Sequence, residues 1–348
     1  MGSTGAAGGA SGAEPRFARL AALLSGGGPV LVQTHDYPDS AAGAAAWGLV
    51  ELLGRRGVAA EIGYRGEIRS RSLARLLAEL AIPIRDLSRA GGSEADAPGR
   101  RVVVVDGSPS NGNVSLVPGG LVGVVDHHCK VGEPLAPFVD VRPGLASCSS
   151  IIQGYWAETG EPMPRPIATA LLAGIQSDTD FLSRRASPED FAAYAELFAA
   201  GDFEKASRIV RTVLDLGELE LVTRALDEAE IRDGLLWACL PGPCGQEVLA
   251  VLAEFVLRTE ELRAAVVAEL DAPGPHAPDG AGARGVHLSV RSKDPALSAF
   301  SLVRAALEGI GAGGGHSHSA GGFVPAASFP GEAALRERFF ALVGKIAP

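Results

Sequence analysis

Histidines and aspartates follow several apolar segments of this chain, at the point where each segment ends. These residues are His35, Asp36 and Asp39 in "HDYPD", Asp106 after "VVVV", Asp126, His127 and His128 after "LVGVV", and Asp178 and Asp180 after "LLAGIQS". Imidazole and carboxylate groups together suit Mn²⁺, Zn²⁺ or Fe²⁺. Several carboxylates cannot all be ionised within a few ångströms of each other without cations between them. The excess of carboxylates and the lack of paired CxxC motifs favour Mn²⁺, with Mg²⁺ as the less favoured alternative.

Each aspartate also has a simpler interpretation, as a helix N-cap or a turn residue. The strands and helices that would position these residues decide between the metal-ligand interpretation and the cap or turn interpretation. Residues 29–34 form a short apolar run and residues 58–64 are strand-like. Residues 101–107 and 120–128 contain continuous runs of β-branched side chains, which are typical of strands buried on both faces. Residues 41–57, 70–80 and 165–178 have helical patterns. This alternation predicts an α/β domain with a doubly wound parallel sheet. The acidic groups would then meet at the carboxyl ends of its strands, where such sheets bind ligands.

The second half of the chain suggests a smaller α/β domain with a different task. The predicted organisation is a flexible tail at 1–14, a metal-binding domain at 15–186, a helical linker at 187–232 and a substrate-binding domain at 233–348. "SVRS" places Arg291 and Ser292 at a strand end, where a guanidinium group can bind a phosphate. The glycine-dense loop at 312–322, with Gly314, Gly315 and His316, would let backbone N–H groups approach an anion. A plain surface loop is the alternative.

Composition limits the partners of the chain. The net charge of −10 and the pI of about 5.3 argue against long duplex nucleic acid, because a polyanion requires a basic face. A short anionic substrate held by metal ions remains compatible with this charge. No apolar run approaches the roughly 20 residues that cross a bilayer, and the first residues do not resemble a secretory signal. We therefore expect a cytoplasmic protein with four free thiols and no membrane partner. A homodimer is compatible with the sequence, which carries no signal for oligomeric state.

Together these motifs resemble the DHH phosphoesterase family, in the branch with a DHH-associated C-terminal domain that includes oligoribonucleases and phosphoadenosine phosphatases. The first motif of the family, H-x-N-P-D-x-D-A, corresponds to "HDYPDSAA". The later motifs correspond to Asp106, to "DHH" at 126–128 and to Asp178. The family's G-G-H-x-x-A-A-G loop is similar to "GGHSHSAG" at 314–321. The resemblance runs from about residue 28 to the end.

The resemblance implies an enzyme that uses up to two Mn²⁺ ions to hydrolyse a phosphoester bond in a small nucleotide or a short single-stranded oligonucleotide. One ion would take His35, Asp39 and Asp106, and the other Asp106, His127 and Asp178. His128 would face the phosphate, and Asp126 would support the two histidines. The substrate would lie in the cleft between the domains, with Arg291, Ser292, Gly314, Gly315 and His316 holding its other end.

Two positions depart from the family pattern. Ala41 replaces the second aspartate of the first motif, so the second ion loses a ligand, and Tyr37 replaces the usual asparagine. Asp180 or Asp36 could substitute for the missing carboxylate. Alternatively, the second site could be weak, or the chain could be a degenerate relative that senses a nucleotide without hydrolysing it. A manganese pyrophosphatase shares the first-domain motifs, but its second domain lacks the glycine-rich loop.

Overall fold

The structure of the chain is a computed structural model that describes residues 15–88, 99–129, 132, 135–211, 214–240, 244, 246–271 and 285–346. The predicted tail at 1–14 lies outside this range. The chain divides into two compact units, residues 1–212 and 213–348. None of the described helices combines the length and the hydropathy that crossing a bilayer requires.

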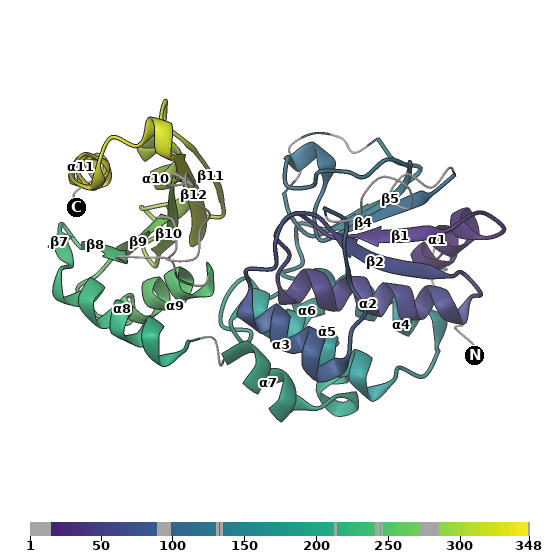
Figure 1. Ribbon diagram of the computed structural model, residues 1–348. Coiled ribbons are helices and arrows are strands. Elements are labelled where there is room, and N and C mark those ends of the chain that lie inside the picture. The colour runs from purple at the N-terminus through teal and green to yellow at the C-terminus, as the bar shows by residue number, and fades with distance from the viewer. Residues whose placement is uncertain are drawn as a thin grey trace, which may run out of the picture. The chain divides into compact units, whose positions relative to one another are not determined.

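The first unit is built on a six-stranded, all-parallel sheet with the order β3-β2-β1-β4-β5-β6 (Figure 1). Its strands are β1 (Val30–Gln33), β2 (Ala60–Tyr64), β3 (Arg85–Asp86), β4 (Arg101–Val105), β5 (Gly120–Asp126) and β6 (Phe138–Val141). This order is that of a doubly wound sheet, with the change of direction between β1 and β4. It confirms the predicted α/β class.

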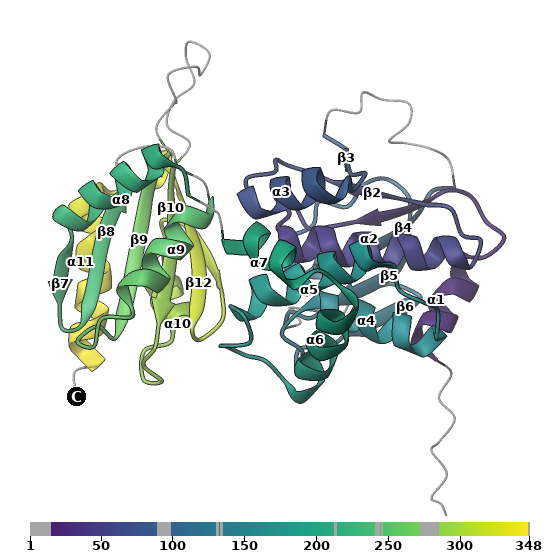
Figure 2. The ribbon, with the colours of Figure 1, turned by 90° about the horizontal axis from the view of Figure 1, so that it is seen from below.

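The two faces of this sheet are covered differently. Its helices are α1 (Arg16–Leu24), α2 (Ser40–Arg55), α3 (Arg71–Leu80), α4 (Cys148–Thr159), α5 (Arg165–Thr179), α6 (Pro188–Ala200) and α7 (Phe203–Arg211). Figures 1 and 2 show α2, α4 and α5 on one face, where Val30 and Val32 pack into the larger core. On the opposite face, Leu31 packs against Val114 and Val117 of the segment that follows β4. This segment contains the short 3₁₀ helix η1 (Pro109–Asn111).

Helix α2 is the central helix of this layer. Asp39 caps its N-terminus by accepting a hydrogen bond from the Ala42 backbone N–H at 3.0 Å. Almost every residue in the first half of α2 has a small side chain and is buried. A side chain at Gly48 would approach Ile152 of α4 and Leu171 of α5 to within 3.0 Å, so glycine at this position permits the close packing of the three helices. The dense packing fixes the helix whose first turn carries the first motif.

The second unit contains a mixed sheet with the order β11-β12-β10-β9-β8-β7. Its strands are β7 (Glu230–Arg232), β8 (Leu235–Leu240), β9 (Ala264–Asp271), β10 (Gly285–Ser292), β11 (Ala312–Gly315) and β12 (Ser319–Pro325). Its helices are α8 (Leu216–Asp227), α9 (Gln246–Val256), α10 (Ala299–Ala306) and α11 (Glu332–Val343), with short 3₁₀ turns η2 (Ala326–Ser328) and η3 (Gly344–Ile346). Helices α10 and α11 pack on one face, while α8 and α9 cover the other (Figure 2). The glycine-dense segment at 312–322, predicted as a loop, is therefore largely a β-hairpin.

The helices at 187–232 are divided between the two units. Helices α6 and α7 pack against α5 of the first unit, and α8 packs against β8 of the second. The structure therefore differs from the predicted separate helical linker, because each of these helices has an apolar face that its own unit buries.

Candidate metal centre

The histidines and aspartates of the sequence motifs gather where the sheet of the first unit changes direction. His35 and Asp39 follow β1, Asp106 follows β4, and Asp126 and His127 lie at the end of β5. These three strands are neighbours in the sheet and run parallel, so their carboxyl ends share one edge. Doubly wound sheets bind ligands at this position.

One group of possible metal ligands consists of His35, Asp39 and Asp106, whose ligand atoms lie within 4.8 Å of one another. Nδ1 of His35 lies 2.8 Å from the Asp36 carbonyl oxygen, and its Nε2 lies 4.0 Å from Oδ1 of Asp39. Because Asp39 also caps α2, the N-cap interpretation and the ligand interpretation both apply to it. The cap holds the carboxylate in place beside His35.

A second group contains Asp106, His127 and His128. The Asp106 side chain is 3% exposed, and its backbone has a positive φ of 62°, which turns the chain sharply at the end of β4. Nε2 of His127 lies 3.3 Å from Oδ1 of Asp106, but this oxygen has no hydrogen-bond partner. Nδ1 of the buried His127 and Oδ2 of Asp178 also lack partners. Buried polar atoms of three residues of this centre are thus left without a hydrogen bond.

Burial and neighbouring charges shift the pKa values of this centre in opposite directions. Burial alone would raise the pKa of Asp106, but His127 outweighs it, with help from His128 and His35, and the pKa falls below its usual range. Burial lowers the pKa of His127, yet Asp106, Asp178 and Asp126 raise it to about 9. The pKa of Asp178 rises to about 7, chiefly because of burial and despite the opposing charge of His127. Near neutral pH the metal-free centre therefore retains protons that a bound cation would replace.

Asp126 holds the two histidines of the "DHH" motif in position. Its Oδ1 accepts hydrogen bonds from the backbone N–H groups of His127 and His128, and lies 2.8 Å from Nδ1 of His128. The two imidazole rings are 4.3 Å apart. Burial lowers the pKa of His128, but the hydrogen bond with Asp126 outweighs it and raises the pKa overall.

Asp178 and the two candidate substitutes for the missing carboxylate lie in different surroundings. Asp178, in the last turn of α5, interacts electrostatically with His127, Asp106 and Asp39, although it falls in none of the ligand groups of the described chain. Asp180 is exposed, caps α5 with a φ of 45°, and accepts a hydrogen bond from Ser183 at 3.3 Å. Oδ2 of Asp36 accepts a hydrogen bond from the Ser115 N–H. The structure thus does not bring the carboxylates of Asp180 and Asp36 into the ligand groups.

Ala41 is fully buried in the first turn of α2. A Cβ on Gly174 of α5 would lie 3.4 Å from the Cα of Ala41 and 2.1 Å from Oγ of Ser149, so the helices meet closely there.

Cys148, beside Ser149, forms a third buried group with Asp106 and Asp126. Burial raises the pKa of the Cys148 thiol well above its usual value, and the neighbouring aspartates add to this.

Arg185 is a basic residue near the centre that the sequence analysis missed. Burial lowers its pKa, and the carboxylate of Asp178 opposes this shift. Its signal in the sequence was the pair "RR" shortly after Asp178 in "DTDFLSRRAS". A guanidinium group beside the carboxylates is suited to hold a phosphate.

The predicted substrate residues of the second unit already have partners within that unit. Nε of Arg291 donates to Glu254 at 2.8 Å, and Ser292 is buried and hydrogen-bonded to the backbone of Arg263 and Asp294. The backbone N–H groups of Ala299 and Phe300, at the start of α10, donate to the carbonyl groups of Ser317 and His316. Of the glycine-rich segment, Gly314 and Gly315 remain exposed.

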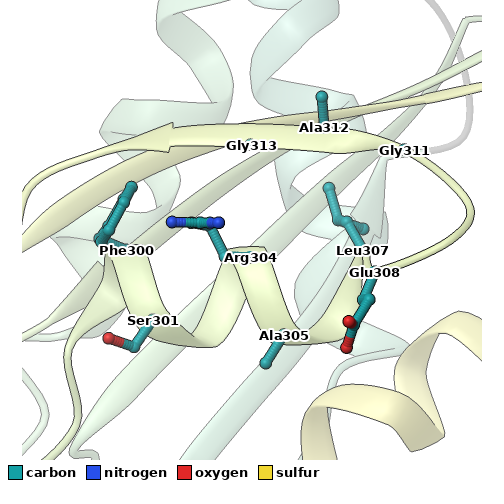
Figure 3. Close-up of a pocket in the computed structure, with 9 residues that line it drawn as sticks. All are labelled: Phe300, Ser301, Arg304, Ala305, Leu307, Glu308, Gly311, Ala312 and Gly313. Atoms are coloured by element: carbon teal, nitrogen blue, oxygen red, sulfur yellow. The ribbon is translucent and has the colours of Figure 1, made fainter. Parts of the chain in front are cut away.

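A pocket of about 540 Å³ lies between α10 and β11 of this unit (Figure 3). Phe300 and Arg304 extend from the helix toward the strand, and the guanidinium group of Arg304 lies 5.5 Å from the centre of the Phe300 ring. Gly313 closes the strand side, next to the exposed Gly314. The pocket thus adjoins the glycine-rich segment without including Arg291 or Ser292.

The donor set of the first unit fits a divalent cation. It offers imidazole nitrogens and carboxylate oxygens. One oxygen of Asp106 and one oxygen of Asp178 are buried without hydrogen bonds. Within the described residues, neither carboxylate forms a salt bridge with Lys or Arg. Such ligands suit Mn²⁺, and His35, Asp39, Asp106, His127 and Asp178 would hold it.

Comparisons with known proteins give relatives for most of the chain. No protein-family model matches it. An uncharacterized protein of Methanocaldococcus jannaschii is 27% identical over 305 residues, which is 86% of this chain. A probable manganese-dependent inorganic pyrophosphatase of Shouchella clausii is 31% identical over 170 residues, or 48% of this chain. The chain spans 59% and 53% of the lengths of these two relatives.

Solved structures resemble the chain over nearly its whole length. An exopolyphosphatase-related protein from Bacteroides fragilis matches with a TM-score of 0.73 and 15% identity, covering 96% of this chain and 98% of its own. RecJ from Thermus thermophilus, in complex with Mn²⁺, matches with a TM-score of 0.54 and 17% identity, covering 95% of this chain and 54% of its own. The α/β fold with two sheet domains, predicted from the sequence, is therefore shared with the exopolyphosphatase-related protein and with RecJ.

Proposed function

We propose that the chain is a Mn²⁺-dependent phosphoesterase that hydrolyses a phosphoester bond in a small nucleotide or a short oligonucleotide. One observation carries the proposal: buried carboxylate oxygens of Asp106 and Asp178 lack hydrogen bonds beside His127, whose Nδ1 also lacks one. Buried charges require compensation. In the metal-free centre a protonated His127 compensates Asp106, and a bound cation would replace that proton. Bound divalent cations supply charge neutralisation at the phosphoryl oxygens and lower the pKa of water.

The surrounding residues have distinct tasks in this proposal. Asp126 fixes the ring of His128, which places an imidazole next to the ligands, where it can exchange a proton with the reacting phosphate. Arg185 provides a cation beside Asp178 that can hold a phosphate oxygen. In the second unit, the pocket between α10 and β11 offers an aromatic ring and a guanidinium group, which suit a ligand that carries a phosphate or a base.

The relatives support a phosphate substrate and a metal. The relative in Shouchella clausii is a probable manganese-dependent inorganic pyrophosphatase, and the RecJ of Thermus thermophilus is in complex with Mn²⁺. Pyrophosphate and polyphosphate therefore belong in any assay as base-free alternatives to a nucleotide.

A second candidate function is a nucleotide sensor without catalysis. The buried Ala41 favours it, because alanine supplies no ligand where the resembled family has a carboxylate. The five remaining ligand candidates favour hydrolysis, since a sensor has no need for them.

An activity screen separates the two candidates. The full chain with Mn²⁺ is tested on di- to pentanucleotides, cyclic dinucleotides, 3′-phosphoadenosine 5′-phosphate, pyrophosphate and tripolyphosphate. We expect turnover of a nucleotide that EDTA stops and Mn²⁺ restores. Nucleotide binding without turnover of any compound would instead identify a sensor.

A further inference from the structure

Tyr37 occupies the tip of the loop that carries two of the candidate metal ligands. His35 lies two residues before it and Asp39 two residues after it, and both are grouped with Asp106. The Tyr37 backbone N–H donates to the Arg65 carbonyl oxygen at 3.2 Å, which ties this tip to the segment after β2. The Tyr37 side chain therefore projects from the backbone that positions the metal ligands.

The backbone of Tyr37 is held in an unfavourable conformation. Its φ of 56° lies in the left-handed region, which bulky residues rarely adopt and which asparagine tolerates much better. Strained residues of this kind persist where the surrounding structure over-determines them, often at functional sites. An aromatic side chain at this position is thus retained despite a cost in backbone energy.

The ring of Tyr37 is supported on one side and open on another. The guanidinium carbon of Arg69 lies 4.8 Å from the ring centre, and Glu67 holds Arg69 through an ion pair of 3.1 Å. A Cβ on Gly66 would approach Cδ1 and Cε1 of the ring to 3.2 Å, so glycine at this position permits the close approach of the ring to this segment. Nevertheless, 46% of Tyr37 is exposed.

An exposed ring that is backed by a guanidinium group, and that lies two residues from each of two candidate metal ligands in the sequence, suits one class of ligand. Nucleobases stack on such rings, whatever their identity, because every base has a π-face. Simple phosphates and polyphosphates have no group that can use the ring.

We propose that Tyr37 is a positioning residue that stacks on the base next to the scissile phosphate and so selects nucleotides over base-free phosphates. This inference rests on the proposed phosphoesterase function, and it names the substrate class of that same site. Stacking of one base contributes about 1–3 kcal/mol, which corresponds to about 5- to 150-fold in affinity.

Binding of a fluorescent dinucleotide tests the inference without turnover. The probe is a dinucleotide with one 2-aminopurine base and a phosphorothioate linkage, titrated with Mn²⁺ into the full chain. Stacking quenches 2-aminopurine, so we expect quenching in the wild type and in Tyr37→Phe. Tyr37→Asn should abolish the quenching and weaken binding about 5- to 150-fold, while its backbone strain is relieved. Phe191→Asn, at a 52% exposed aromatic residue of α6, is the matched control and should behave as the wild type.

Turnover gives the second readout. Tyr37→Asn should lower kcat/KM for dinucleotides and leave kcat/KM for pyrophosphate or tripolyphosphate unchanged. Quenching that is absent in the wild type, or that survives in Tyr37→Asn, overturns the inference, and so does an equal loss on base-bearing and base-free substrates. These outcomes differ from failure of the proposed function, which would be the absence of Mn²⁺-dependent hydrolysis of any phosphate compound by the wild type.

Discussion

Two buried aspartates of the first unit, Asp140 and Asp106, show the difference between a structural carboxylate and a metal ligand. Asp140, on the edge strand β6, has no exposed side-chain area and accepts hydrogen bonds from Arg16, from Nε and Nη2 of Arg142, and from the Tyr155 hydroxyl. Asp106, directly after the central strand β4, is nearly as buried, but histidines are its charged neighbours and its Oδ1 has no hydrogen bond.

Both carboxylates have lowered pKa values for different reasons. Burial raises the pKa of Asp140, and Arg142, Tyr155 and Arg16 together outweigh it. Arginine is always charged, so this compensation is permanent. Asp106 depends on imidazoles that lose their charge when deprotonated. A carboxylate that is paired with permanently charged arginines has a structural role. A carboxylate whose neighbours are titratable histidines can bind a metal ion when those histidines lose their protons.

The largest expected effect follows from Asp106→Asn. This change removes the charge shared by both ligand groups, so we expect Mn²⁺ binding to be lost and turnover to fall at least about 10³-fold. Metal content by elemental analysis and turnover of a nucleotide measure both effects. In EDTA, we expect the free energy of unfolding to fall by about 1–3 kcal/mol, because the variant also loses the ion pair of Asp106 with the buried His127.

Asp140→Asn is the matched variant at the other carboxylate. Removing one partner of a buried ion pair is strongly destabilising, and since Arg16 and Arg142 are partly exposed we expect a loss of about 2–4 kcal/mol. Urea unfolding measures this loss. The Mn²⁺ content of the folded protein should stay at the wild-type level. A variant that lost Mn²⁺ and kept its stability would reverse the assignment of the two aspartates.

The two aspartates also differ in how far their neighbours could be predicted from the sequence. The clustering of His35, Asp39, Asp106 and His127 could be predicted because each lies within a few residues after a strand, and parallel strands bring their carboxyl ends to one edge. Arg142 is only two residues from Asp140 in the sequence, but the contacts of Asp140 with Arg16, 124 residues away, and with Tyr155 depend on the fold.

The same limit applies to the predicted phosphate site. Arg291 pairs with Glu254, 37 residues earlier, and only the register of the second sheet and the position of α9 bring these two side chains together. Arg185 was missed because its approach to Asp178 depends on the turn after α5, where Asp180, Phe181 and Leu182 all have positive φ. Side-chain pairs of this kind are tertiary contacts that no local pattern encodes.

Low pH should remove the difference in unfolding free energy between the wild type and Asp140→Asn. The pKa of Asp140 is lower in the folded chain than the value of about 3.9 in an unfolded one, so its stabilising effect is complete above that value. As the pH falls through about 4 toward the folded pKa, the carboxylate is protonated and the effect is lost. The difference in unfolding free energy between wild type and variant should therefore be constant from about pH 7 to about pH 5 and shrink below about pH 4. Urea titrations at these pH values measure it, and a difference that persisted at low pH would contradict the ion-pair explanation.

The smallest effect is expected for Asp180→Ala, and it sharpens the account of the missing ligand at Ala41. Asp180 is exposed and its carboxylate accepts a hydrogen bond from Ser183, whereas the ligand groups lie at the carboxyl ends of β1, β4 and β5. We therefore expect the Mn²⁺ stoichiometry and turnover of Asp180→Ala to match those of the wild type. Loss of one ion per chain would instead show that Asp180 moves to replace the absent carboxylate. If the wild type and the variant bind the same number of ions, substrate oxygens or water must complete any second site, because Ala41 offers no donor.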